Sequence, residues 1–472
     1  MAMLGKRRPN RRRSGVSGLQ RQATPPPVVG EDATAPVIER LAHDGRGVAH
    51  AADGKTLFVA GALPGERVEA AVHRARKRYD EGHVRTVLEA SPQRVAPPCA
   101  HYARCGGCDL QHLSLTGQRT HKQAVLVDLL AREGIELAEP PLLLAEPDTA
   151  YRRRARLGVK VDGEGRLHLG FRERHANRLV DIGACPVLVP RLAALLGPLR
   201  QSLERLEAPR CVGHVELLDS DGGAAVVVRQ LRESPADRER WQAFGEAHGV
   251  AVGHWLGRES PEFAWLTPPP SLHYVLPGGP GDAPLRLRFA PGDFVQVNAA
   301  VNRRLVATVR DWLAVPAGRT VLDLYAGIGN FSLPLAADGA RVTAIEGHPA
   351  MVSRLADNAR DNALTLTAEQ ADLGDIAAVS ALLETHAPRA VLLDPPREGA
   401  EAVCRALTAR PVPVVAYIAC DPATLARDAA RLVHGGYRIA RAAVADMFVH
   451  TSHLESVLLF EHPERQPLSQ GT

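Results

Sequence analysis

Three side chains in the C-terminal third could together carry out covalent chemistry on a carbon atom. They are Asp394, which precedes two prolines and Arg397, Cys420, which ends an apolar run, and Glu455, which precedes the last apolar run. A thiolate can add to an electron-poor carbon, and a carboxylate can accept the proton lost when the adduct breaks down. We therefore expect Cys420 to be a nucleophile and Glu455 a proton acceptor, with a structural thiol as the alternative for Cys420.

A turn further upstream has the features of a nucleoside-cofactor site. Residues 323–331 leave an expected strand and open an expected helix, and the two glycines between them let the backbone approach a ligand closely. Glu346 ends the next expected strand, 19 residues after Gly327, where a carboxylate would bind ribose hydroxyls. Asn330 and Phe331 crowd the place of a pyrophosphate, so the turn favours S-adenosylmethionine over a nicotinamide dinucleotide.

Four cysteines have spacings typical of a metal centre. Cys99, Cys105 and Cys108 lie within ten residues, around glycines at 106 and 107, and Cys185 follows much later. A tight loop can bring three thiolates round one soft metal centre, and a fourth cysteine would complete the ligand set. Only one Cys-x2-Cys pair is present, which favours a 4Fe-4S cluster over zinc, with unligated thiols as the remaining alternative.

The reactive side chains can meet only if the surrounding elements form one sheet edge. Expected strands alternate with expected helices, at 321–325, 341–346, 390–394, 414–420 and 456–460. This alternation indicates an α/β domain with a doubly wound, mainly parallel sheet, whose ligands gather at the carboxyl ends of the strands. If the last strand runs antiparallel, its start lies at that same edge, and Glu455 comes close to Asp394 and Cys420.

The N-terminal part is expected to form a small β-barrel. Apolar and polar residues alternate in five short segments, at 37–38, 47–49, 56–59, 68–72 and 83–87. The basic run 73–79 would form a hairpin tip suited to a nucleic-acid backbone. Together with Gly45-Arg46-Gly47-Val48-Ala49 and Leu63-Pro64-Gly65-Glu66, the pattern resembles the TRAM domain, an RNA-binding barrel; a barrel with an ordinary solvated loop is the alternative.

Composition excludes a membrane-spanning chain and is consistent with several domains. Of the 472 residues, 45% are hydrophobic and 23% charged, and no apolar run is long enough to cross a bilayer. The domain plan that we expect is a basic disordered arm at 1–27, the barrel at 28–90, a central α+β domain with the four cysteines at 91–285, and the cofactor-binding domain at 286–465.

The charge of +4 is unevenly placed along the chain. The first 24 residues hold seven basic and no acidic side chains, which suits contact with RNA phosphates, although a solvated tail is equally consistent. No apolar segment typical of a secretory signal follows the arm, and the seven cysteines are an odd number. We therefore expect a cytoplasmic protein without disulfides, and a monomer that does not bind membranes.

Three C-terminal motifs resemble those of a known enzyme family. They are Asp394-Pro395-Pro396-Arg397, Cys420-x-Pro422-x-Thr424-Leu425-Ala426-Arg427-Asp428 and Asp446-Met447-Phe448-x-His450-Thr451-x-His453-x-Glu455. These motifs look like those of the RNA 5-methyluridine methyltransferases, which use S-adenosylmethionine. With its barrel and four cysteines, the chain is most similar to the bacterial branch that acts on 23S ribosomal RNA and holds a 4Fe-4S cluster. The resemblance implies a C-terminal class I (Rossmann-like) α/β methyltransferase domain, an N-terminal TRAM-like barrel of OB type and a central α+β iron-sulfur domain.

The resemblance also implies roles for individual residues. It makes Cys420 the nucleophile that adds to C6 of uracil, and Glu455 the base that removes the C5 proton. The cofactor contacts that it implies are Gln296, Tyr325, Asn330, Glu346, Asp372 and Asp394. The cluster ligands that it implies are Cys99, Cys105, Cys108 and Cys185.

Some positions depart from the family pattern. Ala326, Asp421 and Val449 stand where cysteine, asparagine and proline are common. We expect Asp421 to matter most, because a carboxylate beside Cys420 would disfavour the thiolate. The departure concerns the rate more than the type of reaction.

Other functions fit the sequence less well. Methylation of a different ribosomal or transfer RNA uridine by the same mechanism is one alternative, and a catalytically inactive RNA-binding protein is another. An inactive protein would not need both Cys420 and Glu455. A radical enzyme would typically have Cys-x3-Cys-x2-Cys and an open iron site, whereas here the first spacing is x5 and a fourth cysteine is available.

Overall fold

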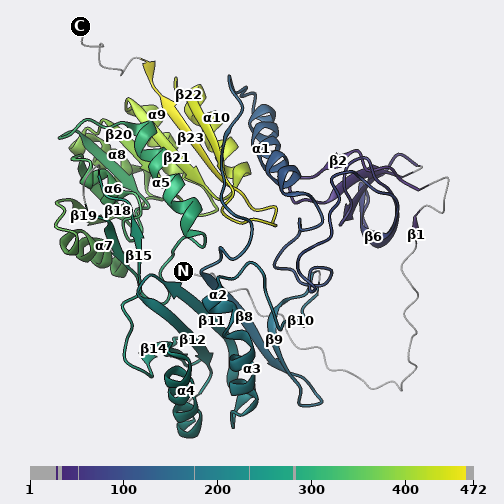
Figure 1. Ribbon diagram of the computed structural model, residues 1–472. Coiled ribbons are helices and arrows are strands. Elements are labelled where there is room, and N and C mark those ends of the chain that lie inside the picture. The colour runs from purple at the N-terminus through teal and green to yellow at the C-terminus, as the bar shows by residue number, and fades with distance from the viewer. Residues whose placement is uncertain are drawn as a thin grey trace, which may run out of the picture.

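The computed structural model describes residues 28–29, 35–51, 53–174, 176–232, 234–279 and 283–463. Figure 1 shows a small barrel in purple, a central α+β body in teal below, and a larger C-terminal body in green and yellow. The basic arm expected at 1–27 lies outside the described residues.

The barrel is built on a six-stranded sheet in the order β1-β5-β6-β4-β3-β2. Its strands are β1 (Val28–Val29), β2 (Arg40–Leu41), β3 (Gly47–His50), β4 (Thr56–Ala60), β5 (Arg67–Ala75) and β6 (Tyr79–Glu89). Alternate residues such as Leu57, Val59 and Val68 point into a small apolar core. The prediction of a strand at 37–38 is wrong, because Val37 makes only an isolated bridge to Arg67 and is 53% exposed.

The central body has a seven-stranded sheet in the order β10-β9-β8-β11-β12-β13-β14. Its strands are β8 (Arg154–Val161), β9 (Leu167–Arg172), β10 (Leu179–Asp181), β11 (Val212–Ser220), β12 (Gly223–Gln230), β13 (Ala251–Leu256) and β14 (Glu262–Trp265). Helices α2 (Pro190–Ala193), α3 (Leu196–Glu204) and α4 (Pro235–His248) accompany it, with a short 3-10 turn at Pro209–Cys211. The core of this body contains Leu199, Leu203 and Trp241 from the helices, packed on the sheet. This arrangement confirms the α+β class expected for this part.

The C-terminal sheet has eight strands in the order β19-β18-β17-β20-β21-β23-β22-β7. The strands are β7 (Leu142–Leu144), β17 (Thr320–Leu324), β18 (Arg341–Glu346), β19 (Thr367–Gln370), β20 (Ala390–Leu393), β21 (Val414–Ala419), β22 (Arg438–Ala445) and β23 (Glu455–Glu461). Strands β17 to β21 run parallel, and β23 is antiparallel to both β21 and β22. The doubly wound sheet and its reversed last strand are therefore confirmed.

Helices cover both faces of this sheet, because alternate residues of its buried strands are apolar on both sides. In β21, Val415 and Tyr417 belong to one core and Ala416 and Ile418 to the other. The first core includes α8 (Ile376–His386), α9 (Glu401–Ala409) and α10 (Pro422–His434). The second includes α5 (Ala299–Leu313), α6 (Ser332–Ala337), α7 (Pro349–Asp361) and the hairpin of β15 (His273–Leu276) and β16 (Leu285–Arg288).

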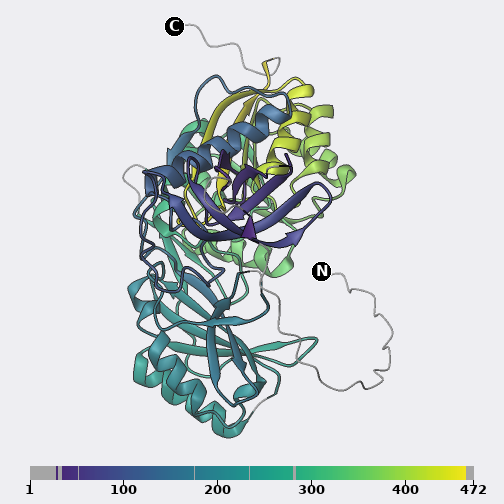
Figure 2. The same ribbon diagram turned by 90° about the vertical axis from the view of Figure 1, so that its right-hand side faces the viewer.

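Besides β15, two elements from the expected central region belong physically to the C-terminal body. Strand β7 pairs with the sheet edge at β22, and helix α1 (Leu115–Arg132) packs its last turns against the first core. Figure 1 places α1 between the barrel and the C-terminal sheet, and Figure 2, seen from the side of the barrel, shows both in front of that sheet. The segment that carries the first three cysteines is therefore tied directly to the sheet that carries Cys420 and Glu455.

In the parts of the chain that the structure describes, no helix is both long enough and apolar enough to span a lipid bilayer.

Candidate active site

Cys420 and Glu455 meet at one edge of the C-terminal sheet. In the antiparallel pair β21–β23, Ala419 is opposite Ser456, so the next residue along β21 and the preceding residue along β23 lie together. Asp394 follows β20, the parallel neighbour of β21, at the same carboxyl edge. The structure thus brings together the three reactive side chains that the sequence singled out.

Burial and mutual charge set the protonation of this group. Glu455 is only 2% exposed, and burial together with the Asp394 carboxylate raises its pKa well above the ordinary value. Burial also raises the pKa of Asp394. The pKa of Cys420 rises to about 11, mainly through burial and then through the charge of Glu455. At neutral pH the free site therefore holds Cys420 as a thiol.

Arg397 supplies the opposing positive charge. Its guanidinium lowers the pKa of Cys420 and that of Glu455, and so favours the charged form of each acid. The sequence analysis gave Arg397 no role of its own in the chemistry. Its place directly after Asp394 and two prolines was the signal that could have assigned it to the site.

The carboxylate of Asp421 has a different role from the one expected. It caps α10 and accepts hydrogen bonds of 3.0 Å from the backbone N–H groups of Ala423 and Thr424. The carboxylates that raise the pKa of Cys420 most are Glu455 and Asp394. The cap directs the charge of Asp421 toward the helix N-terminus, which stabilises it.

The turn after β17 forms a second concave feature at this sheet edge. Tyr325, Gly327 and Gly329 have φ of 64°, 59° and 101°, and a Cβ atom on Gly329 would come within 2.3 Å of Leu333. The Glu346 carboxylate at the end of β18 accepts hydrogen bonds from the N–H groups of Gly327 (3.0 Å) and His348 (2.9 Å). Glu346 therefore fixes the shape of the glycine turn.

Asp323 lies under this turn at the end of the central strand. It is buried, its Oδ2 accepts a hydrogen bond from Ser332, and its Oδ1 has no partner among the described residues. Burial is the main reason that its pKa rises to about 7. A buried carboxyl oxygen without a partner fits a site that a polar ligand completes.

The other expected cofactor contacts lie around the same turn. The Asn330 amide makes two hydrogen bonds with Asn302, of 2.9 and 3.0 Å, and its oxygen also accepts one from the Tyr274 hydroxyl. Gln296 lines a narrow cavity with Tyr274 and Asn302. The sequence did not indicate Asn302 or Tyr274 as site residues, because a buried asparagine on a helix belongs to no motif with a distinctive spacing.

Tyr325 and Asp372 lie close enough for their charges to interact. The charge of Asp372 contributes to a rise in the pKa of Tyr325, which burial takes to about 12. Asp372 is exposed and accepts a hydrogen bond of 2.9 Å from the N–H of Gly374. Its carboxylate is therefore held by the backbone two residues further on and is open to solvent.

Comparisons with known proteins decide the family. A family model described as tRNA (Uracil-5-)-methyltransferase matches residues 281–463, and a TRAM domain model matches 37–84. The chain is 60% identical over 480 aligned residues to the 23S rRNA (uracil(1939)-C(5))-methyltransferase of Halomonas elongata, and the match covers 100% of this chain and 99% of that one. It is 55% identical to the protein of the same description from Chromohalobacter salexigens, with 97% and 95% covered.

The chain belongs to the RNA uracil-C5 methyltransferase family. It is an enzyme of this class, and its N-terminal barrel is a TRAM domain. The crystal structure of Pyrococcus abyssi tRNA (uracil-54, C5)-methyltransferase in complex with S-adenosyl-L-homocysteine is 23% identical. It superposes with a TM-score of 0.69, covering 90% of this chain and 99% of that one, so the two enzymes share a fold.

The four cysteines of the methyltransferase form one neighbourhood. All four are free thiols, and they lie close enough for the charge of one to raise the pKa of another. Cys99 raises the pKa of Cys105 and of Cys185, and both of these raise the pKa of Cys108. Burial raises the pKa of Cys108 to about 12. In the part of the chain that the structure describes, no group of three or more histidine, cysteine or acidic side chains is arranged to hold a metal ion.

The basic run at 151–156 is mostly neutralised inside the protein. Arg153 pairs with Asp219 and Asp221 at 2.7 and 2.6 Å, and Arg154 pairs with Glu216 at 2.8 Å. These arginines join β8 to β11, so their first role is to hold the central sheet together. The side chain of Arg156 is 62% exposed, so it stays open to solvent at the edge of this network.

Proposed function

We propose that this methyltransferase transfers a methyl group from S-adenosylmethionine to C5 of one uridine of 23S ribosomal RNA. The proposed target is the uridine numbered 1939 in the names of its relatives from Halomonas and Chromohalobacter. The observation that carries the chemistry is the meeting of Cys420 with Glu455 at the carboxyl edge of the sheet. We further propose that the enzyme works as a cytoplasmic monomer.

The mechanism follows from the weak nucleophilicity of uracil C5. The Cys420 thiolate adds to C6, and the resulting enolate places electron density on C5, which then forms the bond to the methyl group. S-adenosylmethionine, when bound, supplies that electrophilic methyl group. Glu455 next removes the proton from C5, the electron pair forms the C5–C6 double bond, and the bond between C6 and sulfur breaks to release Cys420.

The charges of the site suit this sequence of steps. Because its pKa is raised, the Glu455 carboxylate is a stronger base than an exposed glutamate. Cys420 must lose its proton before it attacks, and the guanidinium of Arg397 stabilises the thiolate. Asp394 lies between these groups and the cofactor turn, where we propose that it contacts both cofactor and base.

We propose that the cofactor binds in the turn after β17. The unpartnered Asp323 oxygen supports a polar ligand there, and Gly329 leaves the room that a side chain would fill. Glu346 would take the ribose hydroxyls, and Tyr325 would contact the adenosine part. The remaining contacts that we propose are Gln296, Asn330 and Asp372.

The RNA substrate would lie across the barrel and the sheet edge that carries Cys420 and Glu455. Residues 76–78 of the barrel form a basic tip between β5 and β6. A cavity of about 500 Å³ separates the barrel from residues 99–109, which carry the first three cysteines and are called the cysteine loop below. Arg46, Arg172 and Arg174 line that cavity. Because both Cys420 and the methyl donor must reach the ring, the target uracil has to leave its stack, at a cost of a few kcal/mol that contacts of this kind can offset.

We also propose that Cys99, Cys105, Cys108 and Cys185 hold a 4Fe-4S cluster. Four buried or half-buried thiols within electrostatic range of one another are a donor set that suits a soft metal, and ligation would replace their protons. Cys108→Ala should leave the purified enzyme without bound iron, whereas the parent should contain about four irons per chain. Zinc in the parent, or iron retained by the variant, would contradict the proposal.

Trapping with 5-fluorouridine tests the mechanism. Fluorine at C5 cannot leave as a proton, so RNA containing it should remain joined to the enzyme after methyl transfer. We expect a complex that resists denaturant with the parent enzyme and none with Cys420→Ala. Cys404→Ala is the matched control, because that thiol is buried in the first core and should not affect trapping. A trapped complex with Cys420→Ala would overturn the assignment.

A further inference from the structure

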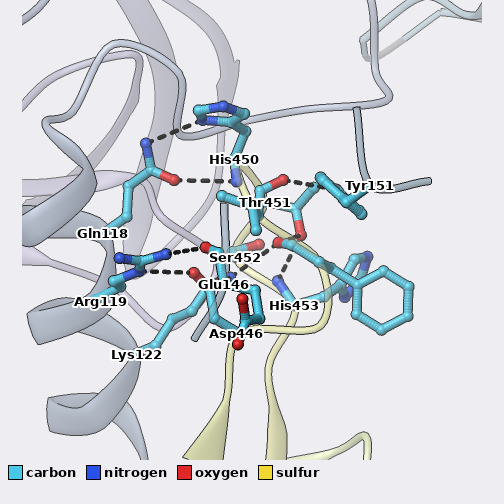
Figure 3. A network of polar contacts seen from close by, with 12 residues as sticks. Gln118, Arg119, Lys122, Glu146, Tyr151, Asp446, His450, Thr451, Ser452 and His453 are labelled. Atoms are coloured by element: carbon cyan, nitrogen blue, oxygen red, sulfur yellow. Dashed lines mark hydrogen bonds and ion pairs between the residues drawn. The ribbon is translucent and has the colours of Figure 1, made fainter. Parts of the chain in front are cut away.

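The loop that precedes Glu455 is held by side chains of α1 and by Asp109, which follows Cys108. Residues 446–454 connect β22 to β23 and end immediately before Glu455. Figure 3 shows residues of this loop among the polar side chains of Gln118, Arg119 and Lys122 from α1, with Glu146 and Tyr151 nearby. Its own members Asp446, Val449 and Leu454 are buried. A buried loop of this kind has the orientation that its hydrogen bonds impose.

Helix α1 fixes the first half of the loop. The Lys122 ammonium is 0% exposed and donates to Asp446 Oδ1 at 2.7 Å and to the carbonyl of Phe448 at 2.9 Å. Arg119 donates to the other oxygen of Asp446 at 3.0 Å. Gln118 accepts a hydrogen bond of 3.0 Å from the N–H of His450, whose φ of 67° lies in the left-handed region. Such a conformation persists in a non-glycine residue only when neighbours impose it.

The cysteine loop fixes the second half. Asp109 directly follows Cys108, and its carboxylate accepts two hydrogen bonds of 2.7 Å from the N–H and the hydroxyl of Ser452. The N–H groups of Asp109 and Leu110 both donate to the carbonyl of His450 at 3.0 Å. Ser452 is three residues before Glu455, so these hydrogen bonds fix the loop close to the base.

The other side of the cysteine loop is bound to the central body. Arg174 donates to the carbonyls of Cys105 and Cys108, and the N–H of Gly106 donates to the carbonyl of Arg172 at 2.9 Å. The cysteine loop is therefore a bridge from the end of β9 to the loop of Glu455. A displacement of Cys108 would therefore also move the carboxylate of Asp109.

We infer that Asp109 is a positioning residue that holds Glu455 in register for removal of the C5 proton, so that the cysteine loop controls the last step of the reaction. This inference rests on the proposed function. Attack by Cys420 and methyl transfer precede proton removal and need no base at C5. A displaced Glu455 should therefore slow release of the covalent intermediate more than its formation.

Asp109→Ala tests the inference through the balance of these two steps. With natural RNA in a single-turnover experiment, we expect the methylated covalent complex to accumulate and its decay to slow about tenfold or more, while its formation changes less than about threefold. Asp109→Asn should restore most of the decay rate, because its amide can accept from the Ser452 N–H and donate to the Ser452 hydroxyl. Ser452→Ala, which loses only the hydroxyl bond, should lie between the two.

Asp162→Ala is the matched control. Its carboxylate also accepts several hydrogen bonds, but among the described residues they come only from positions 164, 166 and 168, close to it in the chain. It should leave both steps unchanged. Iron content, measured for every variant, separates displacement of the loop from loss of the metal.

The inference is wrong if Asp109→Ala slows formation and decay by the same factor, as a general loss of folded enzyme would, or if it leaves decay unchanged. These outcomes differ from failure of the proposed function. In that case the parent enzyme itself would form no covalent complex.

Discussion

Cys420 should ionise unusually late in the RNA-free enzyme. Because burial and Glu455 raise its pKa to about 11, its thiolate fraction at pH 8 is small and rises about tenfold per pH unit until that pKa. Alkylation of Cys420 by iodoacetamide, followed on its peptide by mass spectrometry, should therefore be slow at pH 8 and still increasing at pH 10. A plateau near pH 8.5, the pKa of a free cysteine, would contradict this environment.

Two neighbouring substitutions should move this ionisation in opposite directions. Glu455→Gln removes a negative charge, which lowers the pKa of Cys420 and speeds its alkylation at pH 8. Arg397→Gln removes a positive charge, which raises that pKa and slows alkylation. Each change should be several-fold, and the same direction in both variants would show that charge does not govern the thiol.

At the level of elements, the buried ion pair between α1 and the loop of Glu455 should matter for stability. A buried charge left without any partner costs about 3–5 kcal/mol; Lys122→Ala leaves Asp446 with Arg119, so we expect a loss below that range but above about 1 kcal/mol. Urea unfolding followed by circular dichroism should show the loss in the transition of the C-terminal body.

Arg166→Ala serves as the comparison, because its ion pair with Asp162 involves an arginine that is 67% exposed. Breaking an exposed pair should change the unfolding free energy by no more than about 1 kcal/mol. Equal losses in the two variants would mean that α1 does not anchor the loop.

The sequence predicted the elements that follow a simple period. Strands such as β17, β18 and β21 are buried on both faces and read as continuous apolar runs, so the sheet edge and its reversed last strand could be inferred. Helix α1 could not, because its buried face begins with Gly117, Gln118 and Lys122 and becomes apolar only at Val125. Strand β7 is only three residues long and can be recognised as a strand only from its pairing with β22.

The same limit applies to the candidate site. Cys420 and Glu455 could be singled out because each lies at the end of a strand, and this position follows from the chain alone. Asp109 and Asn302 could not, because their partners are 343 and 28 residues away. Contacts over such separations depend on how whole bodies dock, which no local pattern records.

For the whole molecule, the N-terminal arm should contribute affinity without taking part in the chemistry. Deletion of residues 1–24 removes seven cationic side chains. The slope of log K against log salt concentration for RNA binding should become shallower by about 0.7–0.9 for each RNA phosphate that the arm neutralises in the parent enzyme. Methylation at saturating RNA should keep its rate. An unchanged salt slope would mean that the arm is only a solvated tail.

Release of the C5 hydrogen tests the central claim most directly. Substrate RNA carrying tritium at C5 of its uridines should lose one tritium to water for each methyl group gained, because the methyl group replaces that hydrogen. Glu455→Gln should incorporate methyl groups but release tritium much more slowly, and Cys420→Ala should do neither. Methyl incorporation with full retention of tritium would place the new bond on another atom and contradict the account.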